Sequence, residues 1–101
     1  MPVQIDIDRH AVAEFCRRNH ITRLALFGSV LRNDFAPDSD VDVLVRFDPD
    51  HIPGLIRLGG MAHELSGILG REPVDLLTRE DLSEYFRDEV VASAEVLYDE
   101  G

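Results

Sequence analysis

The sequence predicts one α+β (α/β) domain over residues 1–101, with a small mixed sheet of about three to four strands flanked by helices. Three observations lead to this prediction. Short apolar runs of strand length alternate with longer segments whose apolar residues recur at helical spacing. The 101 residues suit a single domain, and no linker or internal repeat divides them. Apolar residues make up 45% of the chain and charged residues 30%, a balance typical of a globular protein.

The first 39 residues predict a helix, a strand and a short helical turn. Residues 8–19 carry apolar side chains at helical spacing, and Asp8 stands in the position of an N-cap. Residues 21–27, ITRLALF, have the length and composition of a buried strand that ends at Gly28. Residues 29–33 suffice for one or two helical turns, and the segment that follows is rich in turn-forming residues. The apolar residues of the first helix are Ala11, Val12, Phe15 and Cys16.

The remainder of the chain predicts two further strands and two further helices. The strands are 40–47, DVDVLVRF, and 73–78, PVDLLT. Between them, residues 55–69 predict an amphipathic helix that stops at Gly70. Residues 80–98 predict a final helix, within which both tyrosines of the chain are expected to pack. Its apolar residues at helical spacing are Val90, Val91, Ala94, Leu97 and Tyr98.

Composition and charge exclude several classes of protein. No apolar stretch approaches the roughly 20 residues that span a bilayer, and the N-terminus lacks the features of a signal peptide. The single cysteine, Cys16, has no partner for an internal disulfide and is expected to be a small buried apolar residue. These features predict a cytoplasmic protein. The net charge of −10 argues against direct binding to nucleic acid and favours a basic protein surface as partner.

Two carboxylates interrupt the apolar pattern of the second strand. Because side chains alternate faces along a strand, Asp40, Asp42 and Leu44 share one face, while the intervening valines face the core. Cα atoms two residues apart in a strand are separated by roughly 6–7 Å. Carboxylates at this spacing are able to hold a pair of divalent cations such as Mg²⁺. A solvated sheet face is an equally good interpretation of the two aspartates taken alone.

A third carboxylate occurs in the third strand. Asp75 lies between Val74 and Leu76, which are expected to face the core, so Asp75 points to the opposite face. If the third strand lies beside the second, Asp75 completes a cluster of three carboxylates with Asp40 and Asp42. A solvated position on an open sheet face is the alternative for Asp75.

The junction after the first strand has the features of a phosphate-binding loop. Glycine lets the backbone approach a phosphate closely, and the Ser29 hydroxyl and the following amides are able to donate to phosphate oxygens. Arg32 lies about one helical turn after Ser29, within reach of the same anion. A plain turn is the alternative for Gly28 and Ser29 considered by themselves.

Taken together, these segments resemble a known family. Phe27-Gly28-Ser29, ten further residues, and then Asp-Val-Asp-Val at 40–43 match the nucleotidyltransferase signature of the DNA polymerase β superfamily. The run GSVLRNDFAPDSDVDVLV resembles the minimal nucleotidyltransferases, or MNT-type antitoxins, and the resemblance covers nearly the whole chain. It implies the polymerase β-like nucleotidyltransferase fold.

The resemblance also implies roles for individual residues. Gly28 and Ser29, with Arg32, would hold the triphosphate of ATP, the substrate. Asp40, Asp42 and Asp75 would bind Mg²⁺, two ions in all, as the catalytic carboxylates. The third of these acids would also help to deprotonate the attacking hydroxyl.

The implied partner is a HEPN-domain toxin, usually a ribonuclease. The resemblance implies that the antitoxin would transfer AMP from ATP to a tyrosine of the toxin. The shortness of the chain agrees with this, because it leaves little room for an acceptor pocket and another protein is expected to bring the acceptor. Two other functions are considered. An antitoxin that only covers its toxin does not need three acids on one face, and a nucleotidyltransferase for a small molecule would need an acceptor pocket that so short a chain has little room for.

Overall fold

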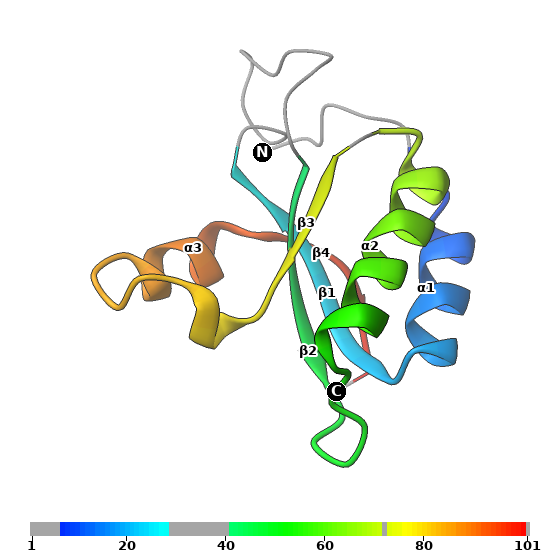
Figure 1. The fold of residues 1–101 in the computed structure, drawn as a ribbon. Helices are drawn as coiled ribbons and strands as arrows, with labels where there is room; N and C mark the ends of the chain where they lie inside the picture. The colour runs from blue at the N-terminus through cyan, green and yellow to red at the C-terminus, as the bar shows by residue number, and fades with distance from the viewer. Residues whose placement is uncertain (1–6, 29–40, 72, 101) are drawn as a thin grey trace.

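The structure is a computed structural model that describes residues 7–28, 41–71 and 73–100. The elements are α1 (Arg9–Arg18), β1 (Ile21–Phe27), β2 (Val41–Phe47), α2 (Leu55–Leu69), β3 (Val74–Leu77), the 3₁₀ turn η2 (Arg79–Asp81), α3 (Arg87–Ser93) and β4 (Glu95–Asp99) (Figure 1). The helical turn expected at 29–33 lies outside the described residues. The three predicted strands and the first two long helices are confirmed, because β1, β2, β3, α1 and α2 lie at the expected residues.

The four strands form one mixed sheet in the order β3-β2-β1-β4. β1 pairs antiparallel with both β2 and β4, whereas β2 and β3 are parallel. Parallel neighbours need a crossover connection, and α2 provides it between β2 and β3. The predicted small mixed sheet is confirmed, and the adjacency of β2 and β3 is what positions the acidic residues.

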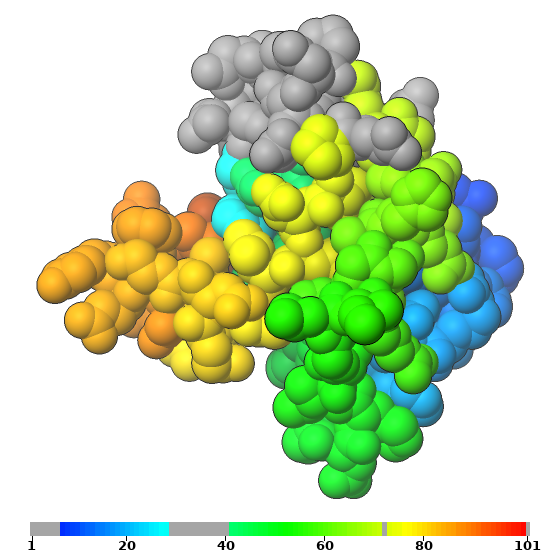
Figure 2. All heavy atoms as spheres, viewed as in Figure 1, coloured from blue at the N-terminus to red at the C-terminus, as the bar shows by residue number. Residues whose placement is uncertain are grey.

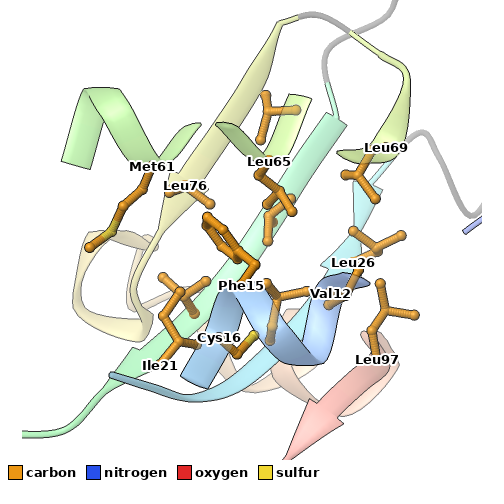
Figure 3. Packing of buried hydrophobic residues seen from close by; sticks show 14 of the residues in the cluster. Val12, Phe15, Cys16, Ile21, Leu26, Met61, Leu65, Leu69, Leu76 and Leu97 are labelled. Atoms are coloured by element: carbon orange, nitrogen blue, oxygen red, sulfur yellow. The ribbon is translucent and has the colours of Figure 1, made fainter. Parts of the chain in front are cut away.

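The hydrophobic core lies between one face of the sheet and the helices α1 and α2, which stand side by side on that face (Figure 1). Phe15 is fully buried at the centre of this layer, between Val12 and Cys16 of its own helix and Leu65 of α2 (Figure 3). The alternate residues of β2 that were expected to face the core are buried, namely Val41, Val43 and Val45.

The ends of both long helices follow the residues that the sequence marks. The Asp8 side chain accepts a hydrogen bond from the Ala11 amide at 3.0 Å, which satisfies one of the free N–H groups at the start of α1. Gly70 ends α2 in the left-handed conformation, at φ 69°. None of the helices in the described part of the chain is long and apolar enough to cross a membrane.

The prediction of one continuous helix over 80–98 is wrong. The structure has η2, a turn, the seven-residue helix α3 and then strand β4 in this region. The segment EVLYD of β4 contains β-branched and aromatic residues and pairs with the open edge of β1, and this pairing outweighs the helical spacing of the valines. α3 buries none of its residues.

The tyrosines expected to pack in that helix are placed differently. Tyr85 is 91% exposed in the turn before α3. Tyr98 lies on β4, against the edge of the core, and its hydroxyl donates to Glu100 at 2.9 Å.

Candidate active site

The acidic residues meet across the register of neighbouring strands. Asp42 of β2 is the direct partner of Asp75 on the parallel strand β3 and of Phe27 on the antiparallel strand β1. Neighbouring strands lie about 4.8 Å apart, so the two aspartates stand side by side on one face. The flanking residues Val41 and Val74 are buried in the core on the other face. The expectation that β3 lies beside β2 is therefore confirmed.

Gly28, at the end of β1, lies close to Asp42 of this pair. Its backbone has a φ of +79°, in the left-handed region that disfavours residues with a side chain. A Cβ atom built on Gly28 would overlap Oδ2 of Asp42. Two independent constraints therefore favour glycine here, the conformation of the chain and its close approach to a carboxylate.

The site lies at one end of the strands, where β1 ends and where β2 and β3 begin (Figure 1). Asp75 is exposed and Asp42 is half-buried, so the carboxylate of Asp75 is accessible from solvent. The structure brings Gly28, Asp42 and Asp75 together. The other three predicted site residues, Ser29, Arg32 and Asp40, lie outside the described residues.

The donor set fits a hard divalent cation. Two carboxylates on adjacent strands offer oxygen ligands from one face, and Mg²⁺ typically takes one or two protein carboxylates and keeps water or phosphate as its other ligands. Among the described residues there is no group of three or more histidine, cysteine or acidic side chains that could hold a metal ion. Asp42 and Asp75, with Asp40 expected as the third ligand, are the residues that would hold Mg²⁺.

Two histidines lie next to each other near the far end of β2, away from the aspartates. No sequence pattern predicted that they would be neighbours. The rings of His20 and His51 stack with their centroids 3.7 Å apart, and His51 Nδ1 lies 3.4 Å from Asp48. Asp48 follows the last residue of β2, whereas Asp42 is near its first. These histidines are therefore no part of the acidic site.

A largely apolar pocket of about 430 Å³, which no sequence pattern predicted, lies farther along the same face. It is lined by residues of β1 and β2, the loop after β2, the segment 78–80 and the α3 region, for example Ala25, Leu44, Ile52, Thr78 and Val91. In the sequence, only the position of Leu44 on the acidic face indicated it. The pocket depends on how five separate segments of the chain come together in the fold.

Comparisons with known proteins assign the fold. The family model described as the nucleotidyltransferase domain matches residues 9–97. This chain belongs to the nucleotidyltransferase domain family. Its match includes Gly28, Asp42 and Asp75, and the chain is thus a nucleotidyltransferase with the fold of the minimal members of that class.

Individual relatives agree with this assignment. The chain is 35% identical over 69 residues to the protein adenylyltransferase MntA of Thermococcus cleftensis, which covers 68% of this chain and 67% of that protein. A solved structure described as a "putative minimal nucleotidyltransferase" has 34% identity and a TM-score of 0.68 and covers 85% of both chains. A toxin-antitoxin crystal structure with AMP-PNP is similar in fold, with a TM-score of 0.71 at 22% identity over 92% of this chain and 74% of that one.

Proposed function

We propose that this nucleotidyltransferase is an antitoxin that transfers AMP from ATP to a tyrosine of a HEPN-type ribonuclease toxin. The observation that carries the proposal is the pairing of Asp42 with Asp75 on an open sheet face, with the Gly28 backbone against the Asp42 carboxylate. The similarity to a protein named protein adenylyltransferase supports a protein as the acceptor. The fold shared with a toxin-antitoxin complex that contains AMP-PNP supports the toxin and the adenine nucleotide.

The residues of the site have separate tasks in this proposal. Gly28 lets the chain turn close to Asp42, and Ser29 with Arg32 holds the triphosphate. Asp42 and Asp75, together with Asp40, hold two Mg²⁺ ions. When bound, these ions would neutralise charge on the α-phosphate and on the departing pyrophosphate. Asp75 is exposed at the edge of the site, where a hydroxyl from another molecule is able to approach it.

The proposed step balances as follows. The acceptor hydroxyl oxygen forms a bond to the α-phosphorus of ATP, and the bond from that phosphorus to the bridging oxygen of pyrophosphate breaks. Asp75 accepts the hydroxyl proton and passes it to solvent. The added AMP places negative charge beside the ribonuclease site of the toxin, where RNA phosphates bind, and therefore inactivates it.

A second candidate is an antitoxin that neutralises its toxin by binding alone. The known toxin-antitoxin fold is compatible with it. The pair of carboxylates against an obligatory glycine favours catalysis, because a covering surface does not require either feature.

The test is intact mass spectrometry of the product of the neighbouring gene, which this proposal takes to be the toxin. The toxin is incubated with the protein, Mg²⁺ and each ribonucleoside triphosphate in turn. We expect whole AMP units to be added from ATP, and Asp42→Asn to abolish the transfer because it removes a charged metal ligand. Asp50→Asn, at an exposed aspartate in the loop after β2, is the matched control and should keep full activity. A toxin that gains no mass and is still neutralised by Asp42→Asn would exclude the catalytic proposal.

A further inference from the structure

The apolar pocket on the open face of the sheet begins one residue pair away from the acidic residues. Phe27, Asp42 and Asp75 are register partners and form one row across β1, β2 and β3. The next row on the same face consists of Ala25, Leu44 and Leu77. Ala25 and Leu44 line the pocket. Because residues two apart in a strand are separated by roughly 6–7 Å, a molecule seated in the pocket lies within one side-chain length of the carboxylates.

Most of the lining is apolar, and its charged residues are three arginines and one acid, Glu80. Arg23, Arg46 and Arg79 line the pocket, three of the ten basic residues in a chain whose net charge is −10. Arg23 and Arg46 both lie near Asp99, at 3.8 and 3.6 Å, and Arg79 lies 3.3 Å from Asp88. These side chains are partly or largely exposed, and such ion pairs are weak enough for the carboxylate of another molecule to compete.

Exposed apolar side chains also occur in the chain segment that leads from the pocket to the start of α2. Ile52 lines the pocket and is nevertheless 70% exposed, and the first turn of α2 continues with Leu55 and Ile56, at 87% and 96% exposure. Figure 2 shows the green segment that follows β2 projecting at the bottom of the molecule, with a re-entrant corner between it and the yellow-to-orange segment on the left. Clusters of large exposed apolar side chains are typical of surfaces that bind a protein, a membrane or a ligand. A nucleotide base would occupy only part of the pocket and would leave Leu55 and Ile56 uncovered.

We propose that this pocket and the first turn of α2 dock the acceptor protein of the transfer reaction. The docking segment of that protein carries apolar side chains for the pocket and at least one carboxylate for Arg23, Arg46 or Arg79. The inference rests on the proposed function for the identity of the acceptor. The docked segment presents the acceptor hydroxyl to Asp42 and Asp75, one residue pair along the sheet.

Calorimetry with the purified product of the neighbouring gene, again taken to be the toxin, tests the docking surface. Arg79→Glu reverses a charge at the pocket, and Ile52→Asp places a charge in its exposed apolar part. Arg17→Glu is the matched control, because Arg17 is also an exposed arginine paired with an acid but lies on α1, on the opposite side of the sheet. We expect each pocket variant to weaken toxin binding by about tenfold or more and the control to bind as the unmodified protein does.

Three further measurements separate the possible occupants. The affinity for Mg²⁺ and AMP-PNP should be unchanged in both pocket variants, and the rate of AMP transfer at saturating toxin should be kept while KM rises. Loss of nucleotide affinity with toxin binding intact would overturn the proposal in favour of a base-binding pocket. Self-association in sedimentation experiments that both variants abolish, again with toxin binding intact, would overturn it in favour of a second copy of this chain.

Two remaining outcomes are also decisive. Equal toxin binding by all variants would overturn the docking surface. Toxin binding that is lost in both pocket variants, in a system where the unmodified protein transfers no AMP, would support the docking surface and contradict the proposed reaction. The two proposals therefore fail independently.

Discussion

At the scale of a single residue, Gly28 is where the predicted phosphate-binding loop meets the aspartates of the candidate site. Its positive φ turns the chain at the end of β1, and its missing side chain leaves room for the carboxylate of Asp42. The other glycines in the described part of the chain, such as Gly67 in α2, have open space where a Cβ atom would be. Glycine is thus required at position 28 for reasons that do not apply to the helical glycines.

Gly28→Ala is expected to lower both stability and activity. The left-handed backbone costs about 1 kcal/mol or more for a residue with a side chain, and the new methyl group displaces Asp42. Urea denaturation should show this loss, and AMP transfer should fall at least about tenfold, since small misplacements of catalytic groups have large effects. Gly67→Ala is the control and should raise stability by about 0.5–1 kcal/mol, because it lies in a helix with free space around it. Normal transfer by Gly28→Ala would show that this glycine does not position Asp42.

Much of the site could be predicted from the sequence at this scale. Asp42 and Asp75 each interrupt a run of core residues, so the face of each follows from alternation alone. Their adjacency could not be derived in this way, because a strand pattern does not specify its neighbour. It depends on the parallel pairing of β2 with β3, which the crossover helix α2 makes possible.

At the scale of elements, the C-terminal region shows where periodicity misleads. Val90, Ala94 and Leu97 have helical spacing, yet the helix stops at Ser93 and Leu97 enters the core from a strand. The deciding interaction is non-local, since β4 pairs with β1, about 70 residues earlier in the chain. A local pattern holds no information about that unpaired edge.

Two alanine substitutions distinguish the observed strand from the expected helix. Leu97 is 8% exposed in the core, so Leu97→Ala should destabilise the protein by about 2–4 kcal/mol. Val90 is half-buried on α3 and lies outside the core cluster, so Val90→Ala should cost about 1 kcal/mol or less. Urea denaturation monitored by circular dichroism measures both. Equal losses at the two positions would favour a single packed helix over β4.

At the scale of the whole molecule, the first and last elements share one core. Val12, Phe15 and Cys16 of α1 belong to the same cluster as Leu97 of β4, while α2 contributes Leu65. α1 contacts β1, β4 and α2, and the closing strand is thus held by the first helix. Such sharing predicts that α1 and β4 do not unfold separately from the rest of the fold.

The single cysteine offers a direct test of this cooperativity. Cys16 is fully buried, and burial raises the pKa of its thiol to about 12, so the folded protein at pH 8 holds almost no reactive thiolate there. We therefore expect iodoacetamide to label Cys16 only after global unfolding. The free energy of opening calculated from the labelling rate should fall with urea concentration with the same slope as the equilibrium free energy of unfolding.

A second cysteine position calibrates the chemistry of this experiment. Ser93→Cys in a Cys16→Ala background places the thiol at the exposed end of α3, where it should react at the rate of an unfolded peptide without urea. If Cys16 instead reacted at a rate that low concentrations of urea did not change, α1 would open locally while the sheet stayed folded. The first helix would then be a separate unit, and the core shared between α1 and β4 would not make the molecule unfold as one.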